Sequence, residues 1–289
     1  MEEKVIQNDI EAKHGVIKHN GSVVINGSVL GGTLQVSGDI VIEGAIIDGN
    51  VTTSGGNITI RQGIEGETTQ VRAFGDIRTD YCHGGNVQSK NGSIYIKSLV
   101  TNSKLDARNL VHCDLGEGVI ERSTVKAGIE IIVNRLGNTK HSTTYVNLSN
   151  ERQQEMFELM LVYEQKLKDK KKRLEKLNKI IRIVRLLGEK VVALPPQKKE
   201  QLAIKVKEYN KIKNEIVQTN EEKRKVIQQN KDLKKYTRAI IVRGKVHPQV
   251  QVMIDKLKHK VVNTFEKVIF YKTGIIIMGD LDEFKLRQR

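Results

Sequence analysis

The chain has 289 residues with 4% aromatic residues and no tryptophan, which argues against an enzyme with a large apolar substrate pocket. Cys82 and Cys113 are its only cysteines, too few for a disulfide framework. Because it lacks both a long apolar run and the start of a signal peptide, we expect a soluble cytoplasmic protein. The formal charge of +15 is uneven, since residues 151–238 hold 25 Lys or Arg against 13 Asp or Glu and so carry +12 of it.

Residues 1–15 are polar and precede the first recognisable repeat. Nothing apolar before Val16 looks large enough to cover the open end of a stack of strands. We therefore expect this segment to form a lead-in or a first capping strand, because an uncovered strand edge invites association with another chain.

A short pattern recurs within residues 1–148: a glycine, a small or polar residue, then two apolar residues separated by one position. The copies begin at Gly21, Gly38, Gly56, Gly75 and Gly92. The steps between them are 17, 18, 19 and 17 residues. Such a period is typical of a stacked repeat, and the alternation indicates strands with one buried face. We predict a right-handed parallel β-helix of about seven coils. Its interior ladders should contain Val23, Ile25, Ile40, Ile42, Ile58, Ile60, Ile77, Ile94 and Ile96.

Between residues 149 and 236 the periodicity becomes helical. Apolar residues follow alternating steps of three and four, interrupted at Lys170 and Gly188, at Met156, Met160, Tyr163, Leu167, Leu174, Leu177, Ile181, Val184 and Val191. This is a heptad seam, and the prolines at 195–196 end the first helix because proline cannot continue it. A second helical run follows, so we predict an antiparallel coiled-coil hairpin with a reach of about 60 Å.

The strand pattern returns in residues 237–289. Short β-branched runs with turns between them occur at residues 239–242, 268–271 and 274–278. We expect these C-terminal strands to pack back on the end of the solenoid, so that the coiled coil is an insertion in one β-rich body.

The order of these parts and several local motifs resemble the flagellar assembly protein A family. The motifs are Gly38-Asp-Ile40, Val71-Arg-Ala73, Gly75-Asp-Ile77, Leu136-Gly137 before the coiled coil and Val242-Arg-Gly244-Lys-Val246 after it. The resemblance implies a non-enzymatic bacterial cytoplasmic protein that acts in flagellar assembly or its regulation through protein contacts. The solenoid is also similar to the C-terminal domain of the septum-site inhibitor protein MinC and, in general shape, to bactofilins, which are binding or polymerising modules.

Two groups of residues carry the side-chain types of a chemical site. Cys82-His83 and His112-Cys113-Asp114 carry ligand types that suit zinc. Adjacent strand residues point to opposite faces, however, so buried cysteines and surface histidines are the favoured interpretation. A polysaccharide-cleaving solenoid would need paired carboxylates, and the candidates are Asp39, Glu43, Asp76 and Asp106. We predict no catalytic, cofactor or metal site, and no enzyme activity.

The strongest charge feature is a basic run on the first helix. It comprises Lys166, Lys170, Lys171, Lys172, Arg173, Lys176, Lys179, Arg182 and Arg185. A solvated coil face is the simplest interpretation. The functional interpretation is a docking surface for an acidic protein partner. Nucleic acid is less favoured, because no reader motif is present and no aromatic residues alternate with the basic ones.

The sequence therefore predicts a non-enzymatic scaffold or adaptor that binds protein partners. Two alternatives stay open. One is a self-polymerising, bactofilin-like element, for which a homo-oligomer is expected. The other is a nucleic-acid or ribosome-associated protein that uses the basic arm.

Overall fold

The computed structural model describes residues 3–149, 151–188, 190, 194–233 and 238–287. The chain divides into two compact units, Met1–Asn150 with Tyr236–Arg289, and Glu151–Lys235. The first unit consists of strands and one short helix, and the second of two long helices. The predicted parallel β-solenoid with an inserted helical hairpin and C-terminal strands is confirmed.

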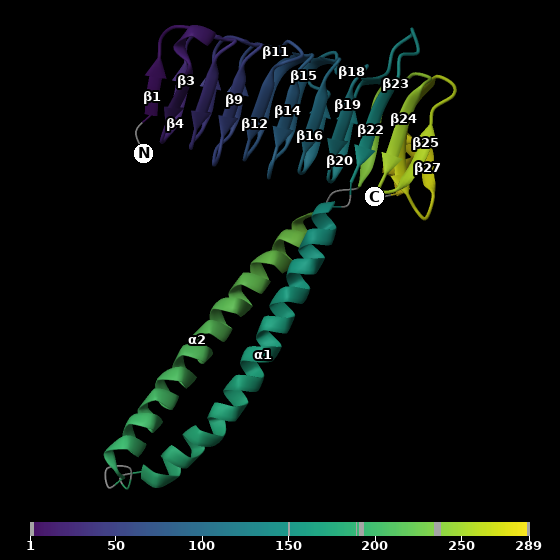
Figure 1. Ribbon diagram of the computed structural model, residues 1–289. Helices are drawn as coiled ribbons and strands as arrows, with labels where there is room; N and C mark the ends of the chain where they lie inside the picture. Colours follow the sequence, from purple (N-terminus) through teal and green to yellow (C-terminus); the bar gives the residue numbers. More distant parts are fainter. Residues whose placement is uncertain (1–2, 150, 189, 191–193, 234–237, 288–289) are drawn as a thin grey trace. The chain divides into compact units, whose positions relative to one another are not determined.

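The strands of the solenoid stack in three parallel columns (Figure 1). The first column contains β1 (Glu3–Ile6), β4 (Ser22–Ile25), β7 (Ile40–Ile42), β10 (Ile58–Ile60), β13 (Ile77–His83), β15 (Ile94–Thr101), β17 (Leu110–Cys113) and β20 (Glu130–Val133). The second contains β2 (Ile10–Glu11), β5 (Val29–Leu30), β8 (Ile46–Ile47), β11 (Gly63–Glu65), the ends of β13 and β15, β18 (Val119–Glu121) and β21 (Arg135–Leu136).

The third column forms most of a separate ten-stranded sheet. Its members are β3 (Val16–His19), β6 (Thr33–Val36), β9 (Asn50–Thr53), β12 (Gln70–Ala73), β14 (Asn86–Ser89), β16 (Lys104–Ala107), β19 (Thr124–Ala127) and β22 (Thr144–Leu148). Together the columns make about eight coils before the helices. The first coil comes from the segment expected as a lead-in or first capping strand, where β1, β2 and β3 pair in register with the second coil and the 3₁₀ turn Ala12–His14 joins β2 to β3.

After the helices the chain adds a further coil next to the last coil that precedes them. Strand β23 (Ala239–Val246) pairs in parallel with β20 and β21, and β24 (Val250–Ile254) pairs in parallel with β22. The last part then changes direction. Strands β25 (Leu257–Lys260), β26 (Phe265–Lys272) and β27 (Ile276–Asp280) pair antiparallel, and α3 (Leu281–Arg287) follows. The C-terminal segment therefore supplies both one more coil and the cap on it.

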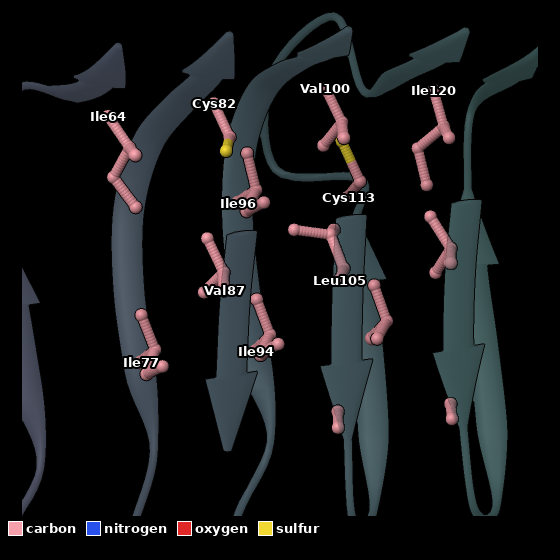
Figure 2. Packing of buried hydrophobic residues seen from close by; sticks show 14 of the residues in the cluster. Ile64, Ile77, Cys82, Val87, Ile94, Ile96, Val100, Leu105, Cys113 and Ile120 are labelled. Atoms are coloured by element: carbon pink, nitrogen blue, oxygen red, sulfur yellow. The ribbon is translucent and has the colours of Figure 1, made fainter. Parts of the chain in front are cut away.

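The core is a set of ladders formed by equivalent residues of successive coils. Ile40, Ile58, Ile77 and Ile94 are directly in register, and each is at most 1% exposed. A second ladder runs through Ile64, Cys82, Val100 and Ile120 (Figure 2). All the residues predicted to lie inside are buried, because the period-two alternation turns one face of each strand inward.

The polar residue after each corner glycine holds the next coil. The Asn57 amide N–H donates to Asp39 Oδ1 at 2.7 Å, and the Asp76 amide N–H donates to Asn57 Oδ1 at 2.8 Å. The glycine itself is needed for close approach, since a side-chain carbon at Gly56 would lie 2.3 Å from the carbonyl carbon of Gly38. The repeated Gly-Asp/Asn-Ile pattern thus encodes a corner, a hydrogen bond to the neighbouring coil and a core residue.

The second unit contains α1 (Glu151–Leu187) and α2 (Pro196–Leu233), packed side by side as a hairpin. The seam predicted for α1 contains its buried residues Met156, Leu167, Leu177 and Ile181. The buried residues of α2 are Ile212, Thr219 and Val226. Val191, the last predicted seam position, lies outside the described residues.

Candidate functional site: the basic face of the helical hairpin

All nine basic candidates lie on α1, but they serve different purposes there. Lys170 is half-buried and faces α2, where its Nζ donates to Thr219 Oγ1 at 3.1 Å and lies 3.3 Å from Glu215 Oε2. Thr219 in turn donates to the Glu215 carbonyl at 2.7 Å. The lysine that interrupts the apolar seam therefore meets a polar layer of the other helix. Such a layer fixes the register of a coiled coil.

Arg173 also faces α2. Its Nε donates to Glu208 Oε1 at 2.9 Å, with a second bond from Nη2, and Lys205 Nζ donates to Glu208 Oε2 at 3.0 Å. Hydrogen bonds from Lys205 and then Arg173 lower the pKa of Glu208. A further interhelical ion pair joins Lys223 Nζ to Glu164 Oε1 at 2.8 Å. These contacts make Arg173 part of the hairpin interface.

The other candidates lie on the surface. Lys166 Nζ lies 5.7 Å from the centre of the Tyr163 ring, a cation–π contact on its own helix. Within the described part of the chain, six candidates are exposed and make no ion pair or hydrogen bond: Lys171, Lys172, Lys176, Lys179, Arg182 and Arg185.

Three of these exposed residues form a row. Lys172, Lys176 and Lys179 are spaced by four and three residues, which places them on one face of α1, opposite the buried Leu177. Lys168, four residues before Lys172, is exposed on the same face and is not one of the nine candidates. Its spacing of four is the signal that could have identified it. We call Lys168, Lys172, Lys176 and Lys179 the outer lysine row.

The cysteine and histidine motifs do not meet at a common site. Cys82 and Cys113 are buried in the core, and burial raises the pKa of the Cys113 thiol to about 12. His112 lies on the outer face beside Glu130, with Nε2 3.2 Å from Oε1, and its ring meets Tyr95 edge-on. Among the described residues no group of three or more His, Cys, Asp or Glu side chains could hold a metal ion.

The candidate carboxylates are likewise dispersed. Asp39 and Asp76 accept hydrogen bonds from the backbone at the corners, as described above. Glu43 faces Arg61, with 3.7 Å between Oε1 and Nε. Asp106 lies on the outer face of β16. Their positions serve the corners and the surface of the solenoid.

No helix in the described part of the chain is long and apolar enough to cross a membrane. The comparison with protein families gives one match, to the Flagellar Assembly Protein A beta solenoid domain, over residues 2–276. No curated protein and no solved structure matches the chain.

Proposed function

This chain belongs to the Flagellar Assembly Protein A beta solenoid family, and from that premise we propose that it is a non-enzymatic scaffold of the bacterial cytoplasm. Membership points to a role related to flagellar assembly. In this proposal the solenoid is the rigid body and the hairpin carries the docking surface for an acidic protein partner.

The observation that carries the proposal is the outer lysine row. Lysines on one exposed helix face, without ion pairs to other described residues, concentrate positive charge where a partner can reach it. Complementary charges speed up encounter and select partners of the opposite sign. Lys170 and Arg173 bind α2 within the hairpin. The proposed docking surface therefore contains fewer basic residues than the run in the sequence.

The test is a capture experiment with nuclease-treated lysate of the native host, using the full chain as bait. The variant Lys172→Gln/Lys176→Gln/Lys179→Gln should lose an acidic protein that the unchanged chain captures. Its thermal midpoint should be unchanged, because exposed substitutions of this kind shift stability by less than about 0.5 kcal/mol.

The matched control is Lys198→Gln/Lys213→Gln/Lys225→Gln on α2, which removes the same charge from exposed residues that do not form a row. The control should keep the partner. Retention of the partner by the row variant would contradict the proposal. Capture that depends on omitting the nuclease would instead assign the row to nucleic acid.

A second candidate function is assembly into a polymer, and one feature of the first coil favours it. Val5 in β1 and Val16 in β3 are 51% and 54% exposed, and within the described chain these strands pair only with the second coil. A partly apolar strand edge is a template for another chain. Sedimentation should then show particles that grow with concentration, and a discrete small oligomer at every concentration would reject this candidate.

A further inference from the structure

The outer face of the ten-stranded sheet is hollowed near its C-terminal end. The hollow has a volume of about 690 Å³ and is lined by residues of β16, β19, β22, β24 and β25. These strands are consecutive neighbours in this sheet. Its size lies in the range of about 300–1,000 Å³ that is usual for ligand sites. We call it the C-terminal groove.

The strand register shows how the floor of the groove is built. Outward-facing side chains form two rows that cross the strands. One row contains Lys104, Thr124, Tyr145, Gln251 and Lys260. The other contains Asp106, Lys126, Asn147, Met253 and Lys258. Each row therefore combines residues from coils that lie far apart in the sequence, including strands on both sides of the helical insertion.

The lining of the groove carries more positive than negative charge. Lys104 and Asp106 lie at one end, Lys126 lies between the ends, and Lys258 and Lys260 lie at the other end. The three terminal lysines are Lys104, Lys258 and Lys260. All three are exposed, and none makes an ion pair or hydrogen bond with another residue that the structure describes.

The next strand outside the groove, β14, presents the uncharged residues Asn86 and Gln88 at the equivalent positions, and β12 beyond it presents Gln70 and Arg72. The run of lysines therefore stops at β16.

Between the lysines the floor offers one acceptor without a donor. The side-chain oxygen Oδ1 of Asn147 is buried and, among the described residues, has no hydrogen-bond partner. A buried acceptor in this state destabilises the free protein, so a ligand that supplies a donor gains affinity from it. Tyr145 and Met253 lie beside it and provide apolar surface.

We propose that the C-terminal groove binds an extended acidic peptide segment of a partner protein. Carboxylates of the peptide pair with the terminal lysines, and a backbone N–H donates to Asn147 Oδ1. Apolar side chains between the carboxylates lie on Tyr145 and on Met253, whose flexible thioether adapts to different shapes. A uronic-acid polymer carries similar charge but lacks such apolar side chains.

The length of the groove sets the length of the segment. Five strands at a spacing of about 4.8 Å span about 19 Å, which six extended residues at about 3.3 Å cover. The groove lies in a different compact unit from the outer lysine row. Binding of a peptide in the groove therefore does not depend on whether that row binds a partner.

The test uses the full chain and fluorescence anisotropy with a labelled hexapeptide, Glu-Glu-Leu-Leu-Glu-Glu, whose carboxylates are at the two ends with apolar side chains between them on each face of the extended chain. Its counterpart with glutamine in place of glutamate and a labelled hexagalacturonate are the comparison probes. The acidic peptide should bind more tightly than either. Lys258→Gln/Lys260→Gln should weaken its binding by about tenfold, because two exposed ion pairs are lost. The charge-matched control Lys198→Gln/Lys213→Gln on α2 should leave binding unchanged.

Asn147→Leu separates a binding role from a structural one. It removes the unpaired acceptor, so the thermal midpoint should stay the same or rise while the peptide affinity falls. Three results would overturn the proposal: no binding of the acidic peptide, binding unaffected by the groove variants, or binding of the galacturonate in preference to the peptide.

Discussion

Ile77→Ala should lower the free energy of unfolding of the solenoid by about 3–4 kcal/mol. Ile77 is 0% exposed and lies in register between Ile58 and Ile94 of the neighbouring coils. Figure 2 shows Ile77 and Ile94 in this ladder. Truncation leaves a cavity that the ladder cannot close, because backbone hydrogen bonds fix the distance between coils. A loss near the upper part of the usual range for Ile→Ala is therefore expected.

Chemical denaturation followed by circular dichroism measures this effect, with the strand and helix signals analysed separately. Ile47→Ala is the matched control, since Ile47 is an isoleucine of the same solenoid with 36% exposure. It should cost less than about 1 kcal/mol. Equal losses at the two positions would contradict the assignment of Ile77 to a tightly stacked ladder.

Asp255→Asn in the last coil should lower the free energy of unfolding by about 3 kcal/mol. Asp255 Oδ1 accepts from Arg238 Nη2 at 3.0 Å, and Oδ2 accepts from Lys272 Nζ at 2.7 Å. The side chains of Asp255 and Arg238 are only 10% and 20% exposed. Asparagine keeps the shape and tolerates the positive φ of 58° at this position, so the variant removes the charge alone.

The same carboxylate gives the cap a defined pH dependence. Burial opposes ionisation of Asp255, but hydrogen bonds and charges from Arg238 and Lys272 outweigh it and lower its pKa. A lowered pKa in the folded state means that the stabilisation is complete above the unfolded value of about 3.9 and is lost as the pH falls through the folded value. The difference in stability between the unchanged chain and Asp255→Asn should therefore shrink in that acidic range.

Thermal unfolding at neutral and acidic pH measures both effects. Glu266→Gln is the control, because its pair with Lys245 at 3.2 Å is more than half exposed on both sides and exposed pairs contribute little. A difference between the unchanged chain and Asp255→Asn that stays constant with pH would contradict the role given to this carboxylate.

Much of the fold could be predicted because the repeated residues determine the local geometry of each coil. In one copy, Gly56 allows close approach of the next coil, Asn57 bonds to it and Ile58 fills the core. The same triplet pattern recurs about every 17 to 19 residues. The first coil was missed because its strand β1 has no such glycine, and its residues are recognised only through their register with the second coil. The sequence indicates a cap but not the ninth coil, because β23 pairs with β20 across the whole helical insertion.

The candidate site was predicted in part for similar reasons. Spacing along one helix identifies the outer lysine row, since Lys172, Lys176 and Lys179 share a face by their numbers alone. The contacts of Lys170 and Arg173 depend on the register between two helices, which the sequence does not state. The C-terminal groove depends on register between coils on both sides of the insertion, so no local pattern marks it.

The most direct test of the scaffold proposal is to replace residues 151–235 by a short flexible linker and repeat the capture from nuclease-treated lysate. The solenoid unit should remain folded, because β20 and β22 pair directly with β23 and β24. Both chains carry Lys258→Gln/Lys260→Gln, so that the C-terminal groove is weakened equally in the two. The account predicts that the acidic partner held by the chain with the hairpin is lost from the chain without it. Capture of the same partner by both chains would contradict it and would place the docking surface on the solenoid.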